Sequence, residues 1–133
     1  MSIAQLERSA GGVDHIIYTN STGSSIAAGT PIVIEEAGSN LLGTAAVLLN
    51  TLANGESGAA YIIGEFCIDK AAVAFAQGQK VYYDVSATNA NNAANATTDG
   101  DFVLGVCSKA AASGGDYVQF LLNFGPGANT VVS

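Results

Sequence analysis

The chain has 133 residues, of which 49% are hydrophobic and only 11% are charged, and its net charge is −7 at pH 7. A chain of this length fits one domain. Its low charge favours a protein that is partly covered in an assembly, because interfaces are depleted of charged residues. Nucleic acids and anionic membranes attract clustered basic side chains, so we expect neither as a partner. The four basic residues are scattered: Arg8, Lys70, Lys80 and Lys109.

The first thirteen residues are small and polar and contain Gly11-Gly12 near their end. They include no apolar run of signal-peptide length, so we expect no export by the general secretory route and synthesis in the cytoplasm of the host cell. They are also too short to hold a helix alone. We therefore interpret residues 1–13 as an arm that becomes ordered against an adjacent subunit or another partner. Ile3 and Leu6 are spaced three apart and could form its contact face.

Short apolar segments separated by turn residues follow this arm. Three of them, 15–19, 31–36 and 41–49, are predicted as strands. Residues 59–69 alternate with a period of two, which is typical of a half-buried strand, and we expect one strand there. The alanine-rich segment 70–77 predicts one or two helical turns, followed by a glycine in the C-cap position.

The sequence KVYYDV at 80–85 alternates in the same way. Neighbouring strand residues point to opposite faces, so one of Tyr82 and Tyr83 should pack inward and the other should lie at the surface or an interface. Residues 86–101 are polar and low in complexity. They lack the large apolar groups that offset ordering entropy, which predicts a mobile loop or a wide surface excursion.

The last two predicted strands cover 102–108 and 116–124. The second is the most regular in the chain, and its inward face is expected to carry Val118, Phe120, Leu122 and Phe124. Together these elements predict an all-β fold, a small β-barrel or sandwich with at most one short helix. The predicted organisation is an N-terminal arm at 1–13, a β-rich domain at 14–125 and a flexible tail at 126–133.

No pattern in the sequence predicts a catalytic residue, a cofactor or a metal site. His15 is the only histidine, and no catalytic triad can be built around it. Two acidic pairs could supply the acids of a glycosidase, namely Glu35-Glu36 and the same-face pair Glu65 and Asp69, although such residues are more often solvated charges. Asp99-Gly100-Asp101 is too short for a calcium loop.

The two cysteines, Cys67 and Cys107, are too far apart in sequence for a C-x-x-C site. Each lies in an apolar segment that is predicted to be a strand. Two partly buried free thiols and one disulfide between neighbouring strands both remain open, because sequence alone does not give their separation.

The order of these features resembles the capsid decoration, or cement, proteins of tailed bacteriophages. The resemblance covers roughly residues 27 to 124. It is carried by a strand written G-x-F-x-(I/L)-x-K, an alanine-rich segment, the sequence Q-G-x-x-V-Y-(W/Y)-D, and later an L-G-V and a G-D turn. The matching residues are Gly64, Phe66, Ile68, Lys70, Gln77, Gly78, Val81, Tyr82, Tyr83, Asp84, Leu104, Gly105, Val106, Gly115 and Asp116. The family more often has tryptophan in place of Tyr83 and proline in place of Asp69.

The resemblance implies a non-enzymatic β-rich protein that forms homotrimers on the outer surface of a virion. It implies that these trimers hold neighbouring major capsid subunits together after the shell expands. The candidate partner contacts are Ile3, Leu6, Tyr61 and Tyr82. Two other classes remain open: a carbohydrate-binding β module in which exposed tyrosines such as Tyr61 or Tyr117 stack on sugars, and an enzyme subunit that uses the paired acids.

Overall fold

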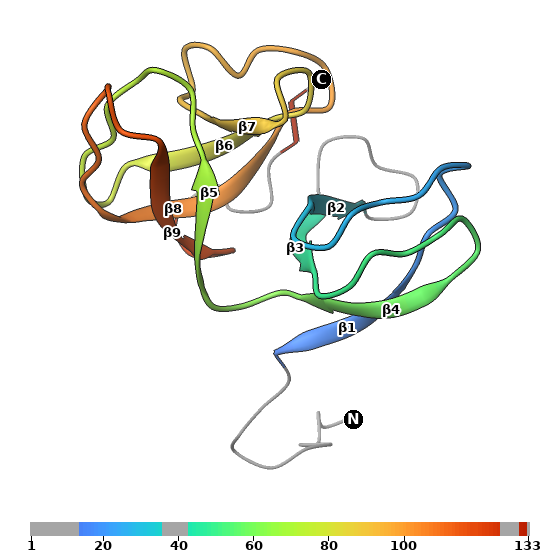
Figure 1. The fold of residues 1–133 in the computed structure, drawn as a ribbon. Coiled ribbons are helices and arrows are strands. Elements are labelled where there is room, and N and C mark those ends of the chain that lie inside the picture. The colour runs from blue at the N-terminus through green and yellow to red at the C-terminus, as the bar shows by residue number, and fades with distance from the viewer. Residues whose placement is uncertain (1–13, 36–42, 126–130, 133) are drawn as a thin grey trace, which may run out of the picture.

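The computed structural model describes residues 14–35, 43–125 and 131–132. These residues form nine β-strands in two antiparallel sheets, with no helix among them (Figure 1). The first sheet has the order β1-β4-β3-β2 and the second has the order β5-β9-β8-β6-β7. The all-β prediction is confirmed, and two facing sheets, neither closed into a barrel in the described part of the chain, are compatible with a sandwich. The strands are β1 (His15–Thr19), β2 (Pro31–Glu35), β3 (Gly43–Leu48), β4 (Ser57–Tyr61), β5 (Glu65–Asp69), β6 (Lys80–Asp84), β7 (Asn89–Asn91), β8 (Phe102–Lys109) and β9 (Tyr117–Leu122).

The larger hydrophobic core lies inside the curved five-stranded sheet. The edges of this sheet approach each other at one end, where Lys70 after β5 forms a parallel bridge with Ala90 in β7. Large side chains from β6, β8 and β9 fill the interior because alternate strand residues point to the same side. The buried members of this core include Phe75, Val81, Tyr83, Phe102, Leu104, Cys107, Val118, Phe120 and Leu122.

The smaller core lies on one face of the first sheet and is built around Ala46, Leu48, Leu52 and Ala60. Half-buried residues of β1 and β2 pack around it. The loop before β2 is held to the loop after β3 by Asn20, which is fully buried and donates to the carbonyl oxygens of Ser24 and Leu52 at 2.7 and 2.9 Å.

Strand β3 belongs to both cores because its side chains alternate between the two faces. Ala46 and Leu48 pack into the smaller core. Ala45 and Val47 point the other way and pack into the larger core. The first sheet therefore lies against the five-stranded sheet through β3 and its neighbour β2.

The single strand that we predicted at 59–69 is wrong, because the chain divides there into β4 and β5, which belong to different sheets. The break falls at Ile62–Gly64, where Gly64 has a φ of 133°, a conformation that favours glycine. The carbonyl oxygen of Gly64 accepts a hydrogen bond from the N–H of Leu122 at 2.9 Å. Alternation of side chains continues across the break, so the sequence pattern does not reveal it.

The predicted helical turns at 70–77 are also wrong, because this segment is an extended connection. The buried Lys70 ammonium donates to the carbonyl oxygens of Ala71, Val73 and Ser113 at 3.2, 2.7 and 3.3 Å. Phe75 is buried in the larger core and bridges Ala111. The long-range contacts among these, of Lys70 with Ser113 and of Phe75 with Ala111, outweigh the helix propensity of the alanines. Only the turn at Gly78 agrees with the prediction.

The polar segment 86–101 is not a surface excursion throughout. Asn89–Asn91 form β7, and Ala90 and Ala96 are buried. The fully buried Asp101 accepts hydrogen bonds from the N–H groups of Val85 and Thr98 at 2.9 and 3.0 Å. Small residues and internal hydrogen bonds thus order a segment that composition alone predicts to be mobile.

Two expectations at the C-terminal end need correction. Phe124, which we placed on the inward face of the last strand, is exposed because Asn123 adopts a φ of 58° and ends the strand. Val131, which we placed in a flexible tail, is 4% exposed and bridges Phe102. The rest of the predicted tail, 126–130 and 133, lies outside the described residues.

Candidate functional site

Several residues of the sequence motifs support the fold. A Cβ atom at Gly105 would overlap the carbonyl oxygen of Leu121 and stand 2.8 Å from its carbonyl carbon, so β8 and β9 approach too closely for a side chain. The Asp84 carboxylate accepts from Ser86 Oγ and from the N–H groups of Ser86 and Ala87 at 2.6 to 3.1 Å. These hydrogen bonds, led by that of Ser86 Oγ, lower the pKa of Asp84. Asp84 therefore shapes the β6–β7 turn.

Among the described residues, the titratable side chains do not gather into a reactive centre. Within residues 14–35, 43–125 and 131–132, no three His, Cys, Asp or Glu residues lie close enough to hold a metal ion. His15 Nδ1 lies 2.7 Å from Asp14 Oδ1 at an exposed position. Glu65 and Asp69 lie at opposite ends of β5. Four strand residues separate their Cα atoms by roughly 13 Å. That separation exceeds the spacing of both glycosidase classes.

The cysteines are free and lie on opposite faces of the five-stranded sheet. Cys67 is exposed on β5, and Cys107 is buried on β8. Strand β9 runs between them. Burial raises the pKa of the Cys107 thiol, which donates to the carbonyl oxygen of Lys109 at 3.0 Å. Of the two alternatives, the structure has the free thiols, although Cys67 is more exposed than we expected.

An apolar surface lies where the first sheet meets the five-stranded sheet. It consists of Ile17, Leu49, Tyr61, Ile63 and Phe124, and we call it the junction face. Ile17, Ile63 and Phe124 are 69%, 59% and 62% exposed, and Leu49 is 47% exposed. These are four of the six large hydrophobic residues that are exposed in the described chain, so apolar exposure is concentrated here.

The register of the strands brings these side chains together. Ile17 lies opposite Ala59, and the N–H of Leu49 donates to the Ala59 carbonyl at 3.1 Å, which places Ile17, Ala59 and Leu49 in one row. Tyr61 lies opposite His15 in the next row. Exposed apolar groups in such a continuous arrangement mark contact surfaces, whereas single ones carry no such signal.

The remaining part of the junction face is fixed by Asn123. Its Nδ2 donates to the carbonyl oxygens of Ala45 and Ile62, both at 2.7 Å, and its Oδ1 accepts from the N–H of Ala45 at 3.1 Å. Ile63 and Phe124 each follow a residue of this cluster in the chain, so their backbones lie close together. The Tyr61 ring packs 6.1 Å from that of Phe66, which in turn lies 6.1 Å from Phe120 in the core.

The four candidate partner contacts have different positions. Tyr61 belongs to the junction face and is half-buried. Tyr82 is half-buried on β6, opposite Asn91 and Val103, while Tyr83 points into the core, as the alternation predicted. Ile3 and Leu6 lie outside the described residues. Sequence reasoning missed the exposed residues of the junction face, because Ile17 and Ile63 look like core residues of regular strands.

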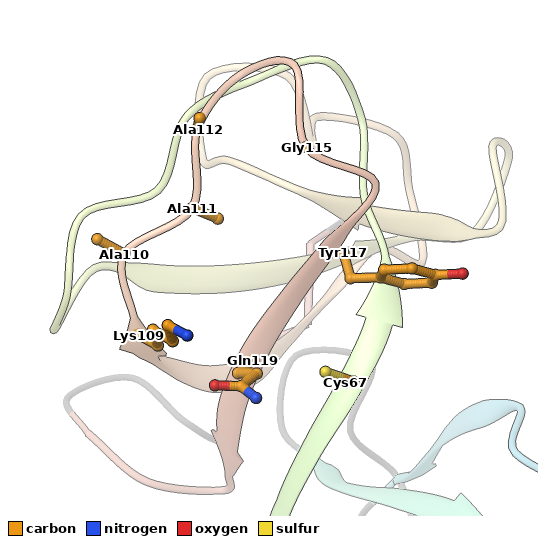
Figure 2. A pocket seen from close by; sticks show the side chains of 8 residues that line it. All are labelled: Cys67, Lys109, Ala110, Ala111, Ala112, Gly115, Tyr117 and Gln119. Carbon is orange, nitrogen blue, oxygen red and sulfur yellow. The ribbon is translucent and has the colours of Figure 1, made fainter.

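A shallow pocket of about 260 Å³ lies on the outer face of β5 and β9 (Figure 2). Alanine and glycine residues of the loop at 110–115 form one wall. Cys67, Lys109 and Gln119 line its floor, with Lys109 and Gln119 paired in the β8–β9 register. The ring of Tyr117, 61% exposed, projects from the rim with its hydroxyl outermost.

A second hollow of about 300 Å³ lies between the loop before β2 and the edge of the five-stranded sheet. Thr30, Pro31, Asp69 and Tyr83 are among its lining residues. Burial, with a smaller contribution from the charge of Asp84, raises the pKa of Tyr83, so its hydroxyl stays neutral. Neither hollow brings a nucleophile together with a base.

The fold and these surfaces define a β-rich protein with large apolar side chains exposed on one face. The chain belongs to the phage cement protein family, whose model matches residues 10–122. Membership places it at the capsid surface of a phage virion and confirms the resemblance seen in the sequence. No curated protein and no solved structure gives a significant match. The described residues include no helix that is long and apolar enough to cross a membrane.

Proposed function

We propose that this chain acts as a cement protein by binding major capsid subunits on the outer surface of the phage head and stabilising the joints between them. The observation that carries the proposal is the junction face, since water-exposed isoleucine and phenylalanine side chains gain free energy when a partner covers them. Tyr61 and Tyr82, with Ile3 and Leu6 of the arm, are the proposed contacts. The proposed mechanism involves no chemical reaction. The contact area that the protein adds across the boundary between two capsid subunits opposes their separation.

The direct test compares two exposed aromatic residues on different faces. Phe124→Ser removes a side chain of the junction face, and Tyr117→Ser removes one of equal exposure on the outer face of β9. Binding of each purified variant to expanded, undecorated capsids is measured as occupancy against concentration. We expect Phe124→Ser to weaken binding by at least about tenfold, as for a central interface residue. Unchanged binding of this variant, or an equal loss for both, would reject the junction face as the contact.

We further propose that the protein is a homotrimer, as the resemblance implies. A low fraction of charged residues suits a chain whose surface is shared with copies of itself. Light scattering of the free protein should give three times the chain mass of 13.3 kDa. A monomer mass in solution together with single, unclustered copies on the capsid would contradict the trimer.

A second candidate function, glycan binding, is favoured by the pocket in Figure 2. Tyr117 offers an exposed ring for stacking on a sugar, and no hydrogen bond is found for the side chains of Lys109 and Gln119 within the described structure. A glycan array probed with the purified protein tests this function. Binding that is lost in Tyr117→Ala and kept in Phe124→Ser would support it, and an empty array would reject it.

A further inference from the structure

The loop between β3 and β4 carries Asn54-Gly55, the only Asn-Gly pair in the chain. The N–H of Glu56 donates to the carbonyl of Ala53 at 3.0 Å and closes a four-residue turn around this pair. Within the turn only Gly55 has a positive φ, of 89°, which makes it a type II turn. Both residues of the pair are exposed, so water reaches the Asn54 side chain.

An Asn-Gly pair can modify itself, because glycine has no side chain to hinder the approach of its backbone nitrogen. The nitrogen of Gly55 attacks Cγ of Asn54 and gives up its proton, and a new C–N bond closes a succinimide ring. The bond from Cγ to Nδ2 breaks, and the side-chain nitrogen leaves with that proton as ammonia. Water then opens the ring to aspartate or isoaspartate, which is why such asparagines are labile.

The hydrogen bonds of this turn oppose the reaction in the folded protein. The attacking nitrogen is engaged, because the Gly55 N–H donates to the carbonyl oxygen of Asn20 at 2.6 Å. The group that would be attacked is held as well, since Asn54 Oδ1 accepts from the N–H of Gly23 at 2.8 Å. Both partners belong to the loop at 20–24, so ring closure requires that this loop first release the turn.

We propose that Asn54 is a deamidation site of this chain and that the loop at 20–24 controls its rate. The loop is held in shape by Thr22, whose N–H and Oγ1 donate to Asn20 Oδ1 at 3.0 and 2.7 Å. Local opening of these bonds exposes the reactive pair without global unfolding. Isoaspartate lengthens the main chain of the turn by one methylene group, which breaks its fit to Asn20. The inference concerns the chain itself and does not depend on capsid binding.

Peptide mapping of the full-length protein tests the site. The protein is incubated at mildly alkaline pH, both native and unfolded in urea, and mass spectrometry measures deamidation at Asn54 and at Asn95. Asn95 is the internal reference, because it is also exposed but is followed by Ala96. In urea we expect Asn54 to react at least about tenfold faster than Asn95. In the native protein we expect Asn54 to react at least about tenfold more slowly than in urea.

A matched pair of variants tests the control by the loop. Thr22→Ala removes the hydroxyl that holds Asn20 and should speed native deamidation severalfold, to a rate still below that in urea. Thr97→Ala, at an exposed threonine of another loop, should leave the rate unchanged. Equal rates at Asn54 and Asn95 in urea would overturn the site. Equal rates in native and unfolded protein, or equal rates in the two variants, would overturn the control by the loop.

Discussion

The two sheets of this protein differ in how they bury their apolar residues. The five-stranded sheet surrounds a core of aromatic and branched side chains, and its buried Lys70, Asp84 and Asp101 have hydrogen-bond partners. The first sheet covers a smaller core in which most of the surrounding side chains are only half-buried. Its other face contributes Ile17, Leu49 and Tyr61 to the junction face. The comparison predicts that the five-stranded sheet supplies most of the stability, while under the proposed function the first sheet supplies contact area.

The largest expected effect tests the stabilising region. Phe120→Ala should lower the free energy of unfolding by about 3–5 kcal/mol, because the ring is buried in the larger core and its loss leaves a cavity. The matched change on the contact region, Ile17→Ala, should cost less than about 0.5 kcal/mol, as is usual at exposed positions. Denaturant titration measures both. Similar losses of unfolding free energy in Phe120→Ala and Ile17→Ala would mean that the two sheets contribute equally to stability.

The next effect concerns the connection between the regions. Asn123→Ala should cost about 2–3 kcal/mol, because the N–H and C=O groups of Ala45 and the carbonyl of Ile62 lose their partner. Gln119→Ala, on the outer face of β9, is the control and should be close to neutral. The same titration applies. A neutral Asn123→Ala would show that the sheets are held together by apolar packing alone.

A smaller effect depends on pH. The pKa of Asp84 is lower in the folded protein, so its contribution to stability is present above about pH 4, the ordinary range for a free aspartate, and is lost as the pH falls. Asp84→Asn should therefore cost about 1–2 kcal/mol at pH 7. The difference in the free energy of unfolding between this variant and the natural protein should become smaller below pH 4. Urea titrations at several pH values test this, and a constant difference would exclude the proposed role of the carboxylate.

The smallest effect is expected in the polar segment 86–101. Asn95 is exposed, and its Nδ2 donates only to Asn91 Oδ1 at 3.2 Å. Asn95→Ala should change the free energy of unfolding by less than about 0.5 kcal/mol. Ala96→Asp, at the buried neighbouring position, should be clearly destabilising. Thermal melting compares the two variants. Equal melting temperatures would mean that Ala96 is not buried and that the segment 86–101 is a surface loop throughout.

Periodicity in the sequence predicted the strands well where both ends carried turn residues. The strands at 15–19, 80–85 and 116–124 were located to within two residues, and the opposite orientations of Tyr82 and Tyr83 were correct. Alternation could not reveal the break at Gly64, because the pattern of side chains continues across it. Helix propensity gave the wrong structure at 70–77, because the segment is held by distant residues: Lys70 donates to the carbonyl of Ser113, and Phe75 bridges Ala111.

The candidate site was only partly accessible from the sequence. Tyr61, which the sequence analysis named as a candidate contact, lies within the junction face, and its contact role stays a prediction. The exposure of Ile17 and Phe124 could not be predicted, because it depends on which strand forms an edge and on where β9 ends. Both are set by pairing between distant segments, and sheet order does not follow from local patterns.

Strand β3, buried on both faces, has a consequence for cooperativity. Ala45 and Val47 belong to one core while Ala46 and Leu48 belong to the other, so β3 cannot lose its structure without exposing both. The first sheet has no independent melting step as long as β3 remains shared. The first sheet is therefore expected to unfold together with the larger core, although its own core is small. This coupling keeps the junction face folded under conditions in which the first sheet alone would unfold.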